Sequence, residues 1–241
     1  MSVNRIVPSA PVAADGTAGV LPTRTGVYGE AAVAVYGADN GNFADEGTGY
    51  AVMNATPGTG VTGNAAPIAS TSLLPFFHIF NNGVLNIIPK FAYVRVGTAP
   101  SAGATTTNFL SWSDTGSGVT TWSSGGVIAT QVNTNTGQTG IGGAVCRIGA
   151  LVIIAVTARK LWHVQARSVI SVIQDTYYLT FGNPSIGQVT ANITSGTLVA
   201  SGHIAFPPVA IAPKTNWSLS IDGLSQSGAG AYELSLFYVE R

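Results

Sequence analysis

The side chains that most often carry out catalysis are few and scattered in this chain. The three histidines are His78, His163 and His203, and none has a second histidine, a cysteine or a carboxylate at the spacing of a metal-binding motif. The acidic residues are spread along the whole length, from Asp15 to Glu240. We therefore expect no metal site, no cofactor and no enzymatic activity.

Hydrolysis needs a more specific arrangement than these residues offer. A glycosidase needs two carboxylates that face each other across a cleft, and the only adjacent acidic pair is Asp45–Glu46. The G-x-S-x-G motif of serine hydrolases is absent. A β-sandwich hydrolase is therefore the third-ranked interpretation, behind two that need no catalysis.

Residues 58–63 match the G-x-G-x-x-G pattern of nucleotide-binding loops. No strand pattern leads directly into this stretch, and Asn64 to Pro67, which follow it, do not favour a helix. A phosphate-binding loop needs the free amides of a helix N-terminus. In a chain with 30 glycines, the match indicates turns rather than a nucleotide site.

The four tryptophans suggest a second kind of site, a surface that stacks on sugars. Trp162 and Trp217 fall on the inward-facing positions of alternating strands, so we expect both in the core. Trp112 and Trp122 flank a turn at residues 114–118, and we expect these two to be the exposed aromatic contacts. They are the basis for the alternative function, binding of a host surface glycan.

Composition limits the partners of the protein. Charged residues make up 8% of the 241 positions, and 10 basic residues balance 10 acidic ones. Nucleic-acid binding needs a basic surface, which this balance does not favour. A net charge of zero promotes association. The sequence therefore predicts a protein whose surface is largely covered by other protein subunits.

The apolar segments and the single cysteine exclude other classes. Cys146 cannot form an intrachain disulfide and is expected to be a buried, unreactive thiol. Residues 1–11 lack the apolar stretch of a signal peptide. The longest apolar run, residues 148–158, is about half the length that a membrane-spanning helix needs. We expect synthesis in a cytoplasm and no membrane partner.

The clearest structural pattern lies between residues 144 and 182. Residues 147–156 form an apolar run rich in β-branched side chains, and residues 160–170 and 175–181 alternate between apolar and polar positions. A period of two residues predicts half-buried β-strands. These three strands form the centre of the expected fold.

Strand patterns continue on both sides of this centre. Asn82-Gly83 is a strong hairpin signal between residues 73–80 and 84–96, and Pro89 predicts an edge or a bulge. Residues 133–143 are expected to form a surface loop, and residues 232–241 a final strand. About 8–10 strands without a long helix predict an all-β protein, a β-sandwich or jelly roll, over residues 70–241.

Residues 1–69 are rich in Gly, Ala, Pro and Thr, and we expect an extended N-terminal arm. Aromatic residues within the arm would contact neighbouring subunits, because aromatic side chains bury the largest area per residue. The expected contact residues are Tyr28, Tyr36, Phe43 and Tyr50.

Two parts of the sequence resemble virion structural proteins of tailed bacteriophages. In the arm, the resemblance lies in Ala44–Gly47 and in residues 54–60, which read NATPGTG; near the C-terminus it lies in residues 207–219 and 232–241. The resemblance implies a head decoration or cement protein whose jelly roll is similar to the trimers of the tumour necrosis factor type. It brings no active site.

The leading hypothesis is therefore a non-enzymatic virion protein assembled in the bacterial host cytoplasm. Its jelly roll would form a homotrimer, and its arm would contact the major capsid protein or other virion proteins and so stabilise the phage head. The alternative is a tail or fibre component that binds a host surface glycan.

Overall fold

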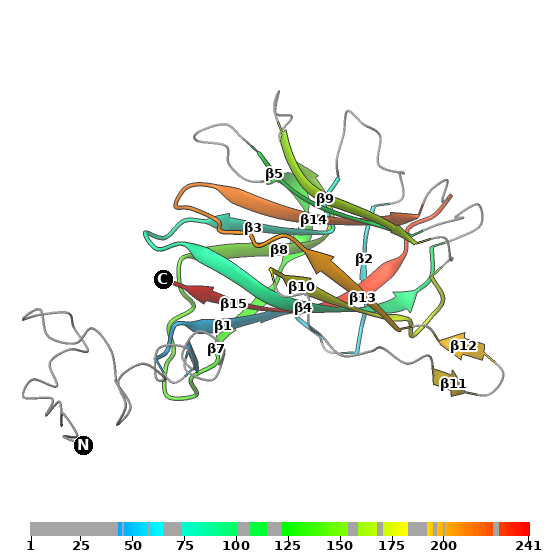
Figure 1. Cartoon of the computed structure of the whole chain (residues 1–241), viewed down its shortest axis with the longest axis horizontal. Helices are drawn as coiled ribbons and strands as arrows, with labels where there is room; N and C mark the ends of the chain where they lie inside the picture. The colour runs from blue at the N-terminus through cyan, green and yellow to red at the C-terminus, as the bar shows by residue number, and fades with distance from the viewer. Residues whose placement is uncertain are drawn as a thin grey trace, which may run out of the picture.

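The computed structural model describes residues 43–44, 46–56, 58–64, 74–100, 107–114, 122–153, 159–167, 171–182, 192–194, 197–199, 201–223 and 227–241. Within these ranges the protein is nearly all β, with two large sheets packed as layers (Figure 1). The prediction of an all-β sandwich is confirmed.

One layer is a seven-stranded sheet. In spatial order it contains β13 (Ser201–Phe206), β10 (Thr176–Phe181), β4 (Ile87–Thr98), β15 (Ala231–Glu240), β1 (Gly49–Met53) and β7 (Thr130–Asn133), with β2 (Val61–Thr62) paired to β15. All neighbours run antiparallel except β10 and β13, which are parallel.

The second layer is a six-stranded sheet. Its order is β6 (Trp122–Ile128), β8 (Ala144–Ile153), β3 (Phe77–Asn81), β14 (Asn216–Gly223), β5 (Thr107–Asp114) and β9 (Arg159–Arg167). A separate two-stranded ribbon consists of β11 (Asn192–Thr194) and β12 (Thr197–Val199).

Eight of these strands form a jelly roll. In chain order they are β1, β3, β4, β5, β9, β10, β14 and β15. The first pairs with the last, the second with the seventh, the third with the sixth and the fourth with the fifth, always antiparallel. This nested pairing is what results when a long antiparallel ribbon is rolled into two sheets. Strands β2, β6–β8 and β11–β13 are additions to that plan.

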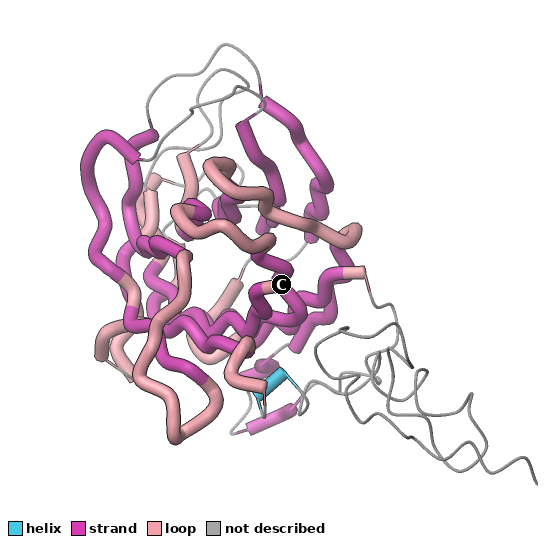
Figure 2. Tube along the Cα trace, turned by 90° about the vertical axis from the view of Figure 1, so that its left-hand side faces the viewer, coloured by secondary structure: helices cyan, strands magenta, loops and turns pink. Residues whose placement is uncertain are grey.

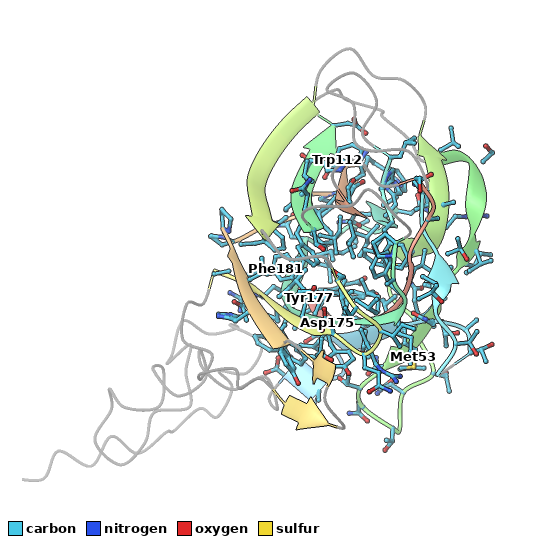
Figure 3. All side chains as sticks on the ribbon, turned by 90° about the vertical axis from the view of Figure 1, so that its right-hand side faces the viewer. Met53, Trp112, Asp175, Tyr177 and Phe181 are labelled. Atoms are coloured by element: carbon cyan, nitrogen blue, oxygen red, sulfur yellow. The ribbon has the colours of Figure 1, made fainter. Side chains whose placement is uncertain are left out.

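Aromatic side chains join the two layers across the core. Tyr177 and Phe181 of β10 point into the space between the sheets (Figure 3). The ring of Tyr177 lies 4.8 Å from that of Phe109, and the ring of Phe181 lies 5.3 Å from that of Trp217. The indole of Trp217 donates a hydrogen bond to Ser111 Oγ at 2.7 Å. The prediction that Trp217 belongs to the core is confirmed.

The predicted alternation holds along most of β10 and of β15, although Thr180 on the outer face is also buried. Tyr177, Leu179 and Phe181 are buried in the core, whereas Tyr178 is exposed on the opposite face. In β15, the side chains of residues 232, 234, 236 and 238 are all buried in the core. The irregular pairing predicted at Pro89 is also present. The register of β4 with β15 shifts between Phe237 and Tyr238, and Tyr238 lies opposite Pro89.

The Asn-Gly hairpin prediction is wrong. The segment around Asn82-Gly83 connects β3 in one sheet to β4 in the other. The buried side chain of Asn81 holds this corner: its Nδ2 donates to Leu85 O at 2.7 Å and to Ile211 O at 2.8 Å, and its Oδ1 accepts from Gly83 N at 2.9 Å. These bonds replace the ladder that a hairpin would have formed.

Two other connections do not join adjacent strands. Strands β5 and β6 follow each other in the chain and lie in the same sheet, but β8, β3 and β14 separate them. Strands β6 and β7 are separated only by Ala129, yet they lie in different sheets. A single connection here passes from one layer to the other.

The boundary predicted between residues 69 and 70 is wrong for the described part of the arm. Strand β1 lies between β15 and β7 inside the seven-stranded sheet, and β2 pairs with the same strand β15. Residues 49–64 therefore belong to the sandwich. Residues 1–42 lie outside the described residues, and an arm there stays a prediction.

Candidate functional site

Among the described residues, no group of three or more His, Cys, Asp or Glu side chains could hold a metal ion. His78 is fully buried, and its Nδ1 lies 2.8 Å from Ser218 Oγ. His203 Nε2 lies 2.8 Å from Thr180 Oγ1 on the outer side of the seven-stranded sheet. The side chain of His163 lies outside the described part of the structure.

Burial shifts two of the described side chains, His78 and Cys146, toward their neutral forms. Burial lowers the pKa of His78 to about 4 and raises the pKa of the Cys146 thiol to about 12. A neutral thiol without solvent access is unreactive. The prediction that Cys146 is buried is confirmed, and the raised pKa of its thiol agrees with low reactivity.

The outer face of the seven-stranded sheet carries the most distinctive surface of the described residues. Phe91, Tyr93, Tyr178 and Phe237 lie on this face, and we call these four the aromatic stripe. Strand alternation points them away from the core, because their neighbours Ala92, Val94, Leu179 and Leu236 are buried between the sheets.

Strand register brings the four aromatic rings together in two pairs. Phe237 of β15 lies opposite Phe91 of β4, and Tyr93 of β4 lies opposite Tyr178 of β10. The Phe91 and Phe237 rings are stacked, with centroids 5.4 Å apart. The Tyr93 and Tyr178 rings meet edge to face at 5.5 Å. Cross-strand aromatic pairs of this kind stabilise a sheet and hold the rings in fixed positions.

The stripe remains partly open to solvent. Phe91 is 45% exposed and Tyr178 is 39% exposed, whereas the Phe237 side chain is mostly covered. Val132, at the edge of the same sheet and opposite Ala51, is 41% exposed. An exposed face with several large apolar side chains is typical of a surface that binds another protein.

One ion pair lies next to the aromatic stripe. The Arg95–Glu233 ion pair, with Arg95 Nη1 3.1 Å from Glu233 Oε1, lies one step further along β4 and β15. Both charges are already matched within the chain. A partner that covered the face would therefore not have to bury an unpaired charge at this point.

Phe43 covers one end of the outer face. Its ring packs on Phe237, Val239 and Ile88. Lys90 Nζ lies 5.1 Å and Arg241 Cζ lies 5.7 Å from the centre of the ring. These contacts explain why the outward-facing residues Phe237 and Val239 are buried, although the alternation predicts exposure.

The predicted contact residues of the arm therefore have different positions. Phe43 and Tyr50 are buried by their own chain, so the prediction that these two contact a neighbouring subunit is wrong. Tyr50 lies in β1, and its ring stacks on that of Tyr238 inside the core at 5.3 Å. Tyr28 and Tyr36 lie outside the described residues.

The predicted exposed tryptophan pair is also corrected. Trp112 is fully buried, and its Nε1 donates to Ser220 Oγ at 2.9 Å. Its position beside a turn suggested exposure, but β5 is an internal strand of the six-stranded sheet, between β14 and β9. The side chain of Trp122 lies outside the described part. The glycan-binding alternative has therefore lost one of its two aromatic residues.

No family model, no curated protein and no solved structure matches this chain. In the part of the chain that the structure describes, no helix has the length and apolar character needed to cross a membrane. The aromatic stripe is the best-supported candidate site, and sequence analysis missed it because its members come from three separate strands.

Proposed function

We propose that this chain is a non-enzymatic virion structural protein, a decoration or cement protein of a tailed phage that assembles as a homotrimer and stabilises the head. The observation that carries the proposal is the aromatic stripe on the outer face of a jelly roll. Support also comes from the low charge of the sequence and from its resemblance to phage virion proteins. The stripe is proposed as the contact between copies of the chain.

The size of the stripe fits the centre of an interface. An aromatic side chain has about 200 Å² of surface, so Phe91 and Tyr178 together expose somewhat less than 200 Å². A stable interface buries roughly 800 Å² on each partner. The stripe is thus the set of anchor residues, and the surrounding neutral residues supply the rest of the area.

The anchor rings are well suited to this role. Each is held by its ring partner on the neighbouring strand before assembly, so little side-chain entropy is lost when a second copy packs against it. The nearest charged pair is already satisfied within the chain. With a formal net charge of zero, copies of the chain do not repel one another.

The N-terminal segment supplies the proposed contact with the capsid. Phe43 is anchored on the sandwich, and 42 residues precede it. Tyr28 and Tyr36 are the aromatic residues of this segment that we propose to bind the major capsid protein or another virion protein. Aromatic side chains that pack on a neighbour bury apolar surface there.

The test uses purified particles of the phage that encodes the chain. The copy number of the chain in the particle should be a fixed multiple of the capsid lattice sites. Deletion of residues 1–42 should abolish binding to heads and leave the mass of the homotrimer unchanged. Presence in only a few copies, at the tail, would instead support the glycan-binding alternative and contradict the proposal.

A further inference from the structure

A second apolar surface lies at one end of the sandwich, apart from the aromatic stripe. Val84 is 88% exposed, Leu85 is 47% exposed and Ile141 is 53% exposed. They belong to two loops, residues 82–86 between β3 and β4 and residues 134–143 between β7 and β8. We call these three side chains the aliphatic tip. Figure 2 looks onto this end of the molecule, with the C-terminus facing the reader.

The two loops touch each other through their backbones. Asn82 N donates to Gly143 O at 2.9 Å. A Cβ at position 143 would lie only 2.4 Å from Gly83 Cα, so this approach requires glycine. Val84 and Ile141 lie one and two residues from this contact in their respective loops, so both loops belong to the same end of the sandwich.

Hydrogen bonds from the surrounding chain hold the two loops of the tip. The side chain of Asn81 bonds three backbone groups of the surrounding chain. Lys214 Nζ donates to Asn82 O at 2.9 Å, and Glu240 Oε1 accepts from Gly143 N at 2.8 Å. Asn86 exchanges two backbone hydrogen bonds of 3.0 Å with Arg241. Because hydrogen bonds already hold these loops, the loops lose little conformational entropy when their apolar side chains bind a partner.

The N-terminal segment leaves the sandwich at this same end. Phe43, where the described chain begins, lies against Arg241. Arg241 in turn pairs with Asn86, the residue after Leu85. The 42 residues before Phe43 therefore start beside the tip, and a partner bound by that segment would face the tip as well.

We propose that the aliphatic tip is the part of the folded body that docks onto the surface bound by the N-terminal segment, an apolar patch on a lattice of capsid subunits. This inference rests on the proposed function. A membrane fits less well, because the tip carries aliphatic side chains without the Trp or Tyr that membrane-interface segments favour. The tip gives the body a defined orientation on the shell, with the end that carries Arg241 facing inward.

The experiment compares three full-length proteins on heads purified from a phage mutant that lacks the chain. The test protein carries Val84→Asp and Leu85→Asp. The control carries Ile173→Asp, which places the same charge at an exposed position (56%) in the turn after which β10 begins, beside the far end of β4. The masses of all three are measured by light scattering, and their folding by circular dichroism.

The tip variant should keep the wild-type mass and fold but bind the heads at least about tenfold more weakly, since two apolar contacts become buried charges. The control should bind like wild type. Equal binding of the tip variant and wild type would overturn the docking inference while leaving the proposed function intact. Failure of wild type to bind would overturn the proposed function itself. Tip-dependent binding of wild type to phosphatidylglycerol–phosphatidylcholine vesicles would assign the tip to a membrane and overturn the inference.

Discussion

Phe91 and Phe237 lie directly opposite each other on adjacent strands, with stacked rings 5.4 Å apart, yet they differ strongly in solvent exposure. Phe91 is 45% exposed and Phe237 is 8% exposed. The difference arises because Phe43 covers Phe237 and stops short of Phe91. The outer face of the sheet is therefore partly covered by the chain itself and partly left open, and the open part is where we place the contact between copies.

The cover provided by Phe43 should make a measurable contribution to stability. Phe43→Ala removes the contacts with Phe237, Val239 and Ile88 and the two cation–π contacts with Lys90 and Arg241. We expect the free energy of unfolding to fall by about 2–4 kcal/mol, measured by urea denaturation at fixed protein concentration. Glu46→Ala, at a nearby exposed position, should change it little; equal effects of the two substitutions would contradict a structural role for Phe43.

Asn81 should be essential to the corner between the two sheets. Asn81→Ala leaves Ile211 O, Leu85 O and Gly83 N without their side-chain partner. We expect a loss of about 2–3 kcal/mol in the free energy of unfolding, because buried polar groups without partners are costly. Asn86→Ala is the control, since the structure shows only backbone bonds from that residue. A neutral Asn81→Ala would show that water replaces the side chain without cost.

Stability should depend on the protonation of His78. Burial lowers the pKa of this histidine from 6.5 to about 4 in the folded state. The unfolded chain takes up the proton first as the pH falls, so stability is complete above pH 6.5 and is lost as the pH falls toward 4. Since one pKa unit corresponds to 1.36 kcal/mol, the loss is roughly 3 kcal/mol.

The comparison that isolates this effect uses His78→Asn, which cannot titrate. The free energy of unfolding is measured for both proteins from pH 7 to pH 4. The free energy of unfolding of wild type should fall steadily relative to that of His78→Asn below pH 6.5. A difference between the two proteins that does not change with pH would show that His78 titrates alike in both states.

Glu240 should act in the opposite direction. Burial raises the pKa of its carboxyl group, although the backbone amides of Gly143 and Ala144 partly oppose the shift. A raised folded-state pKa means that its contribution to stability is complete below the unfolded value of 4.5 and is lost as the pH rises. Glu240→Gln keeps an oxygen for the Gly143 amide and removes the charge. In urea denaturation, the free energy of unfolding of this variant should increase relative to that of wild type as the pH rises from 4.5 to 7. A difference that does not change with pH would contradict the account.

Sequence patterns were sufficient where the structure is decided by burial on one face. The alternation in β10 and in β15 correctly placed Tyr177, Leu179 and Leu236 in the core. Pro89 correctly indicated an irregular pairing. These features depend on single strands, and a period of two residues is visible in any single strand.

The sequence did not reveal which strands pair, and therefore did not reveal the site. Asn82-Gly83 is a local turn signal, and such a signal is the same whether the next strand returns in the same sheet or crosses to the other one. The aromatic stripe depends on the registers of β4 with β10 and with β15, which join residues far apart in the chain. The alternation within each strand predicts that Tyr178 and Phe237 both face outward. The local sequence does not show that the two residues lie in the same sheet.

The central claim is that copies of the chain associate through the aromatic stripe, and the most direct test is the solution mass by light scattering. Wild type should have about three times the chain mass of 24.5 kDa. Tyr178→Lys, which places a charge at the open part of the stripe, should reduce the mass to that of one chain. Ile128→Lys, at an exposed position of the six-stranded sheet, should leave it unchanged. A wild-type monomer, or a Tyr178→Lys variant that keeps the full mass, would contradict the claim.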